Sequence, residues 1–246
     1  MSEREVVLVT GGARGIGAAI ARAAAATGAT VVVNYATSAE AAAELAGELG
    51  NGSIAVHADV ADEAQVVAMF AAIDEALGRL DVLVNNAGIA GGYGSLDVVS
   101  ATMLAELFAV NVAGAFVCAR EAAARMRTDR GGRGGSIINI SSKAAVLGGS
   151  GEWVHYAATK AALDTMTTGI AKELAPFGVR VNTVRPGLID SDFHDHATPG
   201  RLARMAPLIP MLRAGDPAEV AAAVVWLASS AASYVTGAFI DVAGGR

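Results

Sequence analysis

Short apolar runs alternate with helical patterns along the chain. The runs are rich in β-branched residues, as in strands buried on both faces of a sheet, and lie near 5–10, 30–34, 53–57, 81–85, 136–141, 179–184 and 238–242. Segments with a helical pattern lie between them, near 15–27, 38–49, 62–77, 100–126, 155–175 and 216–229. This alternation predicts an α/β fold with three layers, a doubly wound parallel sheet of about seven strands with helices on both faces.

A glycine-rich turn, TGGARGIG at residues 10–17, joins the first predicted strand to the first predicted helix. Gly11 and Gly12 are expected at positive φ, whereas Gly15 and Gly17 lack a Cβ and permit close approach of a ligand and of the strand. Because helix N-termini bind anions, the turn predicts a pyrophosphate site. A tight turn without a ligand is the alternative.

The end of the second predicted strand indicates which ribose such a site would accept. An acidic side chain there would bind a 2′-hydroxyl and repel a 2′-phosphate, but Tyr35 stands at this position, followed by Thr37 and Ser38. Arg14, inside the turn, is placed to pair with a phosphate. Alternatively, Arg14 is a solvated loop residue and Ser38 is only a helix N-cap.

Polar residues also follow the third and fourth predicted strands. Asp59 would accept a hydrogen bond from an adenine amine or cap its own loop. Asn85 and Asn86 need partners, which a ribose or a neighbouring backbone would supply, and Gly88 permits close approach. Asn111 interrupts the apolar face of the helix predicted near 100–126, either as a packing group or as part of a site that holds water.

A serine, a tyrosine and a lysine form the candidate catalytic group. Ser142 follows the fifth predicted strand, and Tyr156 and Lys160 share one helical face because they are four residues apart. A phenol would need its pKa lowered by about three units to act near neutrality, which an exposed ion pair does not provide. A semi-buried Lys160 together with an oxidised nicotinamide would lower it, while Ser142 binds the substrate oxygen and Tyr156 transfers the proton.

Composition narrows the class of protein. The chain has 246 residues, 53% of them hydrophobic and 17% charged, without a linker-like segment, so one domain over residues 1–246 is expected. A net charge of −6 argues against nucleic acid or an anionic membrane as partner. We find no signal-like N-terminus and no stretch near the roughly 20 apolar residues of a spanning helix, which predicts a cytoplasmic protein. Cys118, the single cysteine, is predicted to be buried.

Together these motifs resemble the short-chain dehydrogenases/reductases, NAD(P)-dependent oxidoreductases with a Rossmann-type fold. The matches follow the family's order over nearly the whole chain: TGGARGIG at 10–17, NNAG at 85–88, Asn111, Ser142, YAATK at 156–160 and RPGLIDS at 185–191. The interval from Ser142 to Tyr156 is one residue longer than the family's common form, and Ser141 precedes it. Within the family, the chain is most similar to 3-oxoacyl-carrier-protein reductases and glucose-type sugar dehydrogenases.

The resemblance implies a role for each matching residue. Tyr156 is the general acid/base, Lys160 lowers its pKa and holds the nicotinamide ribose, Ser142 orients the substrate, and Asn111 anchors a relay water. Ser191 stands where the family often has Thr. The cofactor-binding residues that we predict are Gly11, Arg14, Gly15, Ile16, Gly17, Tyr35, Thr37, Ser38, Asp59, Val60, Asn86, Ala87, Gly88, Tyr156, Lys160, Pro186, Gly187, Ile189 and Ser191.

The expected reaction is hydride transfer between a nicotinamide cofactor and a carbonyl or secondary alcohol, with NADP(H) preferred and NAD(H) possible. A non-catalytic nucleotide-binding protein, acting as a redox sensor or scaffold, is the alternative, although it would not need all four tetrad residues. The substrate pocket is expected along 91–96 and 143–153, under a lid near 192–212. In the lid, His194 and His196 superficially suggest a metal, but hydride chemistry in this family needs none.

The expected assembly is a homotetramer. The helices near 100–126 and 155–175 carry Ala-rich second faces, and the segment after Trp226 holds further apolar residues. One sheet and its helices would not bury all of these side chains in a monomer. Family resemblance points to the same assembly, with two-fold axes.

Overall fold

The computed structural model describes residues 4–191 and 198–246. Within them, one sheet contains seven parallel strands in the order β3-β2-β1-β4-β5-β6-β7. The strands are β1 Val6–Val9, β2 Thr30–Tyr35, β3 Ile54–His57, β4 Val82–Asn85, β5 Gly135–Ile140, β6 Val179–Pro186 and β7 Phe239–Val242. The predicted doubly wound α/β fold is confirmed. The strand order reverses between β1 and β4, and ligands bind at such a switch point, outside the carboxyl ends of the strands.

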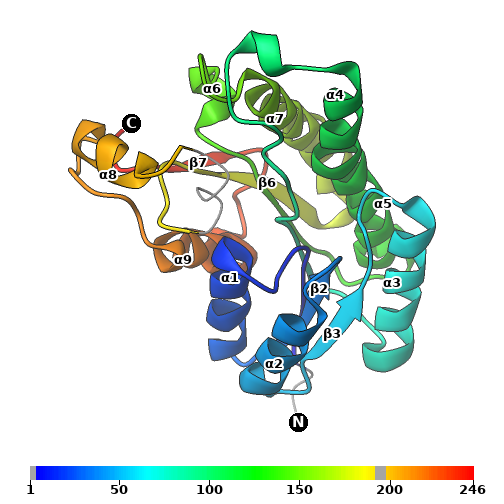
Figure 1. The fold of residues 1–246 in the computed structure, drawn as a ribbon. Coiled ribbons are helices and arrows are strands. Elements are labelled where there is room, and N and C mark those ends of the chain that lie inside the picture. The colour runs from blue at the N-terminus through cyan, green and yellow to red at the C-terminus, as the bar shows by residue number, and fades with distance from the viewer. Residues whose placement is uncertain (1–3, 192–197) are drawn as a thin grey trace.

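Helices cover both faces of the sheet, which gives the three predicted layers (Figure 1). One core packs beneath α1 Gly15–Ala26, α2 Ala39–Leu49 and α9 Pro217–Ala228. The opposite core packs beneath α3 Glu63–Leu77, α5 Gly114–Met126 and α7 Val154–Leu174. Shorter helices, α4 Ala101–Phe108, α6 Ala144–Leu147 and α8 Arg201–Met205, lie in connections after β4, β5 and β6. The sequence pattern missed α6 and α8 because segments this short show no helical period.

The helix predicted over 100–126 is not regular. A π-helical turn at Ala109–Ala113 separates α4 from α5 and contains Asn111. The Asn111 amide donates to the Ile89 carbonyl at 2.9 Å, and its Oδ1 accepts from the Ile89 amide at 2.8 Å. Single π-turns inside α-helices are often found at functional sites. This one aims a buried amide at the segment that follows β4.

The same helical run corrects the expectation that no stretch of the chain approaches the apolar length of a membrane-spanning helix. By length and composition Ala101–Met126 is apolar enough to cross a membrane, with a mean hydropathy of 1.7 over its most apolar stretch, of which 28% is buried. Core helices pass the same test, and α5 packs Ala119 and Ala122 against the sheet. Cys118 is buried there as predicted, and burial raises the pKa of its thiol to about 12.

A buried chain of polar side chains fixes α7 across the sheet. Asn85 donates to Asn139 Oδ1 at 3.0 Å, and Asn139 donates to Thr167 Oγ1 at 2.8 Å. The Thr167 hydroxyl lies 2.7 Å from that of Thr183. These contacts connect β4, β5 and β6 to the middle of α7, so they set the position of the helix that carries Tyr156. Polar groups inside a core are held in place when each finds its partner.

Candidate functional site

A cavity of about 860 Å³ opens at the carboxyl ends of the strands. Its volume is in the range of small-molecule and cofactor sites. All predicted cofactor-binding residues line this one cavity, as do Ser142, Tyr156 and Lys160. The structure also places there residues that sequence reasoning did not assign to the cofactor: Ala13, Asn34, Ala36, Ala58, Ile89, Ala90, Gly91, Val110, Ile140 and Ser141.

The glycine turn has the shape of an anion cradle. Gly11 and Gly15 have φ values of 59° and 51°, but Gly12 is not among the residues at positive φ, so that expectation was wrong. Gly12 is required for space instead, because a Cβ there would lie 2.9 Å from the Val9 carbonyl oxygen. A Cβ on Gly17 would lie 2.6 Å from Asn86 Nδ2. Since α1 begins at Gly15, its first amides face this compact turn.

Side-chain amides hold the turn in place. Asn34 Oδ1 accepts from the Gly11 amide at 3.1 Å, and Asn86 Nδ2 donates to the Gly11 carbonyl at 3.1 Å. The Thr10 hydroxyl accepts from the backbone amides of Asn86 and Ala87, each at 3.0 Å. Of the two kinds of partner expected for the Asn86 amide, the structure shows backbone carbonyls, those of Thr10 and Gly11. Asn34 was missed, although a polar residue inside the apolar run of β2 was a detectable signal.

The residues expected near a 2′-phosphate all line the cavity. Arg14 is exposed at the N-terminus of α1, and Tyr35, Thr37 and Ser38 line the same cavity. The Ser38 hydroxyl accepts no hydrogen bond from a backbone amide of α2 among the described residues, which argues against a capping role for this side chain. Asp59 accepts from the Ala61 amide at 2.9 Å and so caps its own loop, while it also lines the cavity.

Tyr156 and Lys160 are both buried, with relative exposures of 9% and 3%. Lys160 Nζ donates to the Ile140 carbonyl at 2.8 Å and lies 5.6 Å from the centroid of the Tyr156 ring. The Ser141 hydroxyl donates to the Lys160 carbonyl at 3.0 Å, whereas the Ser142 side chain hydrogen-bonds to Tyr156. Ser142 is thus the serine in contact with the phenol.

Burial dominates the electrostatics of this group. It raises the pKa of Tyr156 to about 12, and the hydrogen bond from Ser142 opposes the rise only in part. Burial also lowers the pKa of Lys160 to about 8, against the charge of Asp164, which raises it. Burial thus disfavours both charged forms of the pair by themselves. The expected lowering of the Tyr156 pKa by Lys160 together with an oxidised nicotinamide stays a prediction.

Asn111 lies behind this group rather than in the wall of the cavity. Besides its bonds to Ile89, it donates to Thr159 Oγ1 at 3.0 Å. A Cβ on Gly88 would lie 3.2 Å from Asn111 Oδ1 and 3.3 Å from Lys160 Nζ. The two polar atoms therefore border one small space that exists because residue 88 is glycine.

The segments expected around the substrate meet beside Tyr156. Trp153 is buried and lies 6.5 Å, between ring centroids, from Tyr156. His155 is also buried, with its ring close to Gly91. The expected lid is described from 198 to 212, whereas 192–197, with His194 and His196, lie outside the described residues. Within the described ranges, no group of three or more His, Cys, Asp or Glu is arranged to hold a metal ion.

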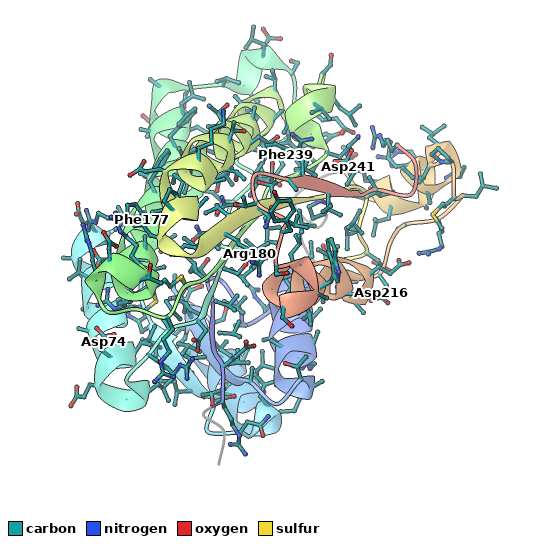
Figure 2. All side chains as sticks on the ribbon, turned by 180° about the vertical axis from the view of Figure 1, so that it is seen from behind. Asp74, Phe177, Arg180, Asp216, Phe239 and Asp241 are labelled. Atoms are coloured by element: carbon teal, nitrogen blue, oxygen red, sulfur yellow. The ribbon has the colours of Figure 1, made fainter. Side chains whose placement is uncertain are left out.

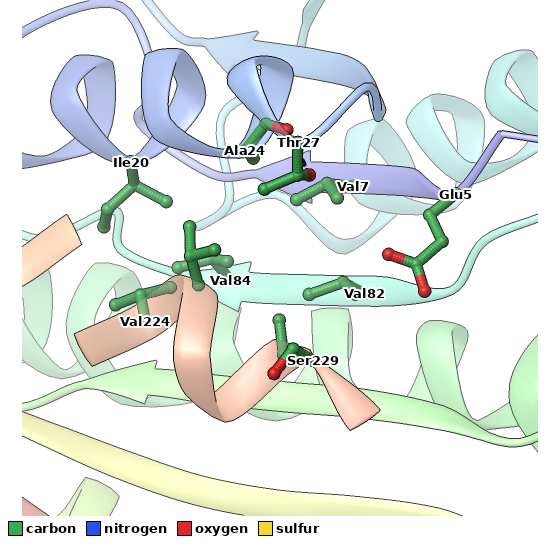
Figure 3. Close-up of a pocket in the computed structure, with 11 residues that line it drawn as sticks. Glu5, Val7, Ile20, Ala24, Thr27, Val82, Val84, Val224 and Ser229 are labelled. Atoms are coloured by element: carbon green, nitrogen blue, oxygen red, sulfur yellow. Dashed lines mark hydrogen bonds between the residues drawn. The ribbon is translucent and has the colours of Figure 1, made fainter. Parts of the chain in front are cut away.

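A second cavity, of about 90 Å³, lies between α1, α9 and the strands β1 and β4. Figure 3 shows Val7, Val82 and Val84 of the strands facing Val224 of α9. Its walls are mostly valine and alanine, and it is far smaller than the cavity at the carboxyl ends of the strands. Convergent polar groups mark functional pockets, and these gather in the larger cavity.

Known proteins resemble this chain over nearly its full length. The family model described as enoyl-(acyl carrier protein) reductase matches residues 11–246. An uncharacterized oxidoreductase of Escherichia coli strain K12, YgfF, is 49% identical over 98% of this chain and 99% of its own. L-rhamnose 1-dehydrogenase (NAD(P)(+)) of Azotobacter vinelandii is 41% identical over 98% and 96%. A crystal structure of 3-ketoacyl-(acyl-carrier-protein) reductase from Brucella melitensis, complexed with NADH, matches with a TM-score of 0.92 and 32% identity, over 99% and 98%.

Proposed function

This chain belongs to the short-chain dehydrogenase/reductase family, and on that premise we propose that it transfers hydride between NADP(H) and a carbonyl or secondary alcohol. One observation carries the proposal: Ser142, Tyr156 and Lys160 line the same cavity as the glycine turn. A nucleotide held by the turn would therefore share its cavity with an acid/base group. A non-catalytic nucleotide-binding protein would have no use for this second feature.

We propose that a dinucleotide occupies this cavity. The glycine turn and the first amides of α1 would hold the pyrophosphate, because Gly11 and Gly17 leave room where a Cβ would collide. Asp59 and Val60 would border the adenine. Pro186, Gly187, Ile189 and Ser191 would border the nicotinamide, at the end of β6.

We propose NADP(H) as the preferred cofactor, with NAD(H) possible. Arg14 is exposed and lines the same cavity as Tyr35, Thr37 and Ser38, and the sequence has no carboxylate directly after β2. A guanidinium pairs well with a phosphate, and hydroxyls donate to it. The Brucella relative was solved with NADH, and for this reason the proposal keeps NAD(H) as a possible second cofactor.

A bound nicotinamide would supply or accept the hydride. Tyr156 would donate its phenolic proton to the carbonyl oxygen in reduction and remove a proton from the alcohol in oxidation. Its pKa, raised to about 12, keeps the phenol protonated at neutral pH, which is the state that reduction requires. Ser142 would hydrogen-bond to the same substrate oxygen, and Lys160 would hold the ribose and, when charged, favour the phenolate. Asn111 would hold a relay water in the space that Gly88 leaves open.

Two classes of substrate follow from the relatives. The relatives are named for a sugar and for an acyl thioester, so we propose either a small ketone or sugar or a 3-oxoacyl thioester. The test is NADPH and NADH oxidation against a panel of ketones, sugar lactones and 3-oxoacyl thioesters, with the reverse reaction on the alcohols. Turnover of one class supports the proposal, and binding of NADPH without turnover of any supports a sensor or scaffold instead.

We further propose a cytoplasmic homotetramer built from one continuous domain. Phe108, Phe116 and Val154, on α4, α5 and α7, are 39%, 45% and 39% exposed, and Trp226 on α9 is 43% exposed. Large apolar side chains at the surface are typical of interfaces between subunits. Light scattering at micromolar concentration measures the mass directly. A mass of one chain, 24.6 kDa, would contradict this assembly.

A further inference from the structure

Three segments that are distant in sequence meet next to the catalytic helix. They are the loop after β4, which contains Tyr93; the turn before α7, which contains Glu152 and Trp153; and α8, which begins at Arg201. Trp153 and Tyr156 form a small buried cluster with Ala90, against which Tyr93 packs. The wall beside the phenol is therefore built from parts of the chain that no single motif contains.

Arg201 joins two of these segments. Its Nε and Nη2 donate to the two carboxylate oxygens of Glu152 at 3.2 Å and 2.6 Å, and its guanidinium lies 4.9 Å from the centroid of the Trp153 ring. The residue is only 7% exposed. A bidentate pair of this kind fixes orientation as well as distance, and a charge on an aromatic face adds to it when water is excluded.

Glu152 receives contacts from the third segment as well. The Tyr93 hydroxyl donates to Glu152 Oε1 at 3.3 Å, and the Gly94 amide donates to the Glu152 carbonyl at 2.8 Å. Burial alone would raise the pKa of Glu152, but the hydrogen bonds and charge of Arg201 hold it below its usual range. Glu152 is therefore the ionised centre of the arrangement.

Contacts between aromatic rings connect the Arg201–Glu152 pair to the active site. Tyr93 packs edge-on against Trp153 with ring centroids 5.1 Å apart, and Trp153 lies tilted against Tyr156 at 6.5 Å. Arg201 covers Trp153 without reaching the phenol itself. Trp153 is not among the residues that line the cavity, but Tyr156 is, so any change that releases the Trp153 ring would alter the packing that holds the phenol and the adjoining cavity wall in place.

We propose that Arg201 is a positioning residue for the carbonyl substrate, which acts through Glu152 and Trp153 to fix the wall beside Tyr156. It would raise the affinity for the carbonyl and leave the affinity for the dinucleotide unchanged, because the contacts of Arg201 lead through Trp153 to Tyr156, whereas Thr10, Asn34 and Asn86 hold the glycine turn. The kinetic part of the inference rests on the proposed function. The contact between Arg201 and Trp153 does not.

The first experiment observes Trp153 directly. The chain has two tryptophans, so Trp226→Phe leaves Trp153 as the sole indole. In that background, Arg201→Gln should shift the Trp153 emission to the red and raise acrylamide quenching about twofold, as expected when a buried ring loses its cover. Arg201→Lys, which keeps the charge but not the fork, should lie between Gln and wild type. An unchanged Trp153 signal in Arg201→Gln would overturn the inference.

The second experiment separates positioning from general stability. Arg201→Gln should raise KM for the carbonyl about tenfold, comparable to the loss of one charge-assisted hydrogen bond, with a smaller fall in kcat and an unchanged Kd for NADPH. Glu152→Gln should act in the same direction, and the double variant should lose less than the sum of both. Equal losses in NADPH affinity and in KM would show a structural role only.

A matched control exists elsewhere in the chain. Arg127 donates to both oxygens of Asp129 at 2.9 Å and 2.7 Å and lies 3.8 Å from the centroid of the Phe177 ring. Phe177 directly precedes β6, whereas Asp241 of β7 pairs with Arg185 near the carboxyl end of that strand, where the cavity opens. Figure 2 shows the two labelled residues well apart, so the Arg127 contact lies away from the cavity. Arg127→Gln should leave KM and the Trp153 signal unchanged.

The two experiments distinguish this inference from the proposed function. If wild type turns over no carbonyl, the proposed function fails, while the Trp153 signal still decides whether Arg201 holds this wall.

Discussion

The nucleotide half and the substrate half of the cavity are held together in different ways. In the nucleotide half, backbone groups and the short side chains of Thr10, Asn34 and Asn86 fix the glycine turn. Beside the substrate half, long side chains such as Arg201 and Glu152 meet next to Trp153 across 49 residues of sequence. Contacts made by backbone persist when neighbouring side chains change, whereas a contact between two long side chains is lost when either of them is replaced.

The largest expected effect separates catalysis from cofactor binding. Tyr156→Phe removes only the hydroxyl that transfers the proton, so kcat should fall on the order of a thousandfold, as for loss of a general acid. The Kd for NADPH should stay within about twofold of wild type, because the ring and its packing remain. Stopped-flow turnover and fluorescence titration measure both. Tyr234→Phe, at a fully exposed tyrosine, is the control, and comparable activity in the two variants would remove Tyr156 from the mechanism.

A second effect concerns Lys160 and appears in the pH dependence of the free energy of unfolding. Burial lowers its pKa from 10.5 to about 8, so the unfolded chain binds more protons between these values, and stability rises with pH across this window. Relative to Lys160→Met, wild type should gain about 2 to 3 kcal/mol between about pH 8 and pH 10. The raised pKa of Tyr156 opposes this only above its ordinary value of 10.0, as stability is then lost toward about 12.

Urea unfolding of cofactor-free protein at a series of pH values measures the difference. Lys172→Met, on the exposed side of the same helix, controls for the loss of a positive charge. A stability difference between wild type and Lys160→Met that stays flat from pH 7 to pH 10 would mean that Lys160 is well hydrated, contrary to its 3% exposure.

A third effect belongs to the nucleotide half alone. Gly17→Ala places a Cβ against the Gly11 carbonyl oxygen and 2.6 Å from Asn86 Nδ2, so the turn must widen. Overpacking of this kind costs about 1 to 3 kcal/mol, which corresponds to about a 5- to 150-fold weaker Kd for either dinucleotide. Gly47→Ala in α2, where a Cβ meets nothing within 4 Å, should bind normally. Calorimetric titration compares them, and full affinity in Gly17→Ala would mean that the turn does not hold the ligand.

The smallest effect concerns the choice between cofactors. Arg14→Ala should weaken NADPH about tenfold, roughly one charge-assisted contact, and leave NADH nearly unchanged. Arg22→Ala, further along α1 and paired with Glu48, controls for the charge. Wild-type affinity for NADH equal to that for NADPH, or equal losses for both in Arg14→Ala, would place the selectivity elsewhere.

The sheet, and the gathering of the glycine turn and the strand-end residues in one cavity, could be predicted from the sequence because both depend on local patterns. Strand ends differ from the expected ones by at most two residues, and each predicted cofactor residue lines the cavity. The failures have physical causes. The π-turn around Asn111 keeps a helical period, so the pattern does not reveal it. The direction of the Tyr156 pKa depends on how completely Tyr156 itself is buried, which spacing alone does not give.

The substrate half escaped prediction for a different reason. Arg201 and Glu152 each look like ordinary surface charges in the sequence, and only the fold brings them together at 2.6 Å. The same holds for the hydrogen bonds that connect Asn85, Asn139 and Thr167. Each of these residues interrupts an apolar or helical pattern, but the pattern does not indicate which residue it will bind. Contacts between distant segments are the information that periodicity lacks.

The most direct test of the account follows the hydride itself. NADPH carrying deuterium at C4 of the nicotinamide, on one face or the other, would be incubated with the best carbonyl of the panel, and the alcohol product would be analysed by mass spectrometry. The account predicts one deuterium at the carbinol carbon from one of the two labelled faces, and none from the other. NADPH bound without loss of label, or an alcohol formed without deuterium from either face, would contradict the assignment of this chain as a hydride-transferring enzyme.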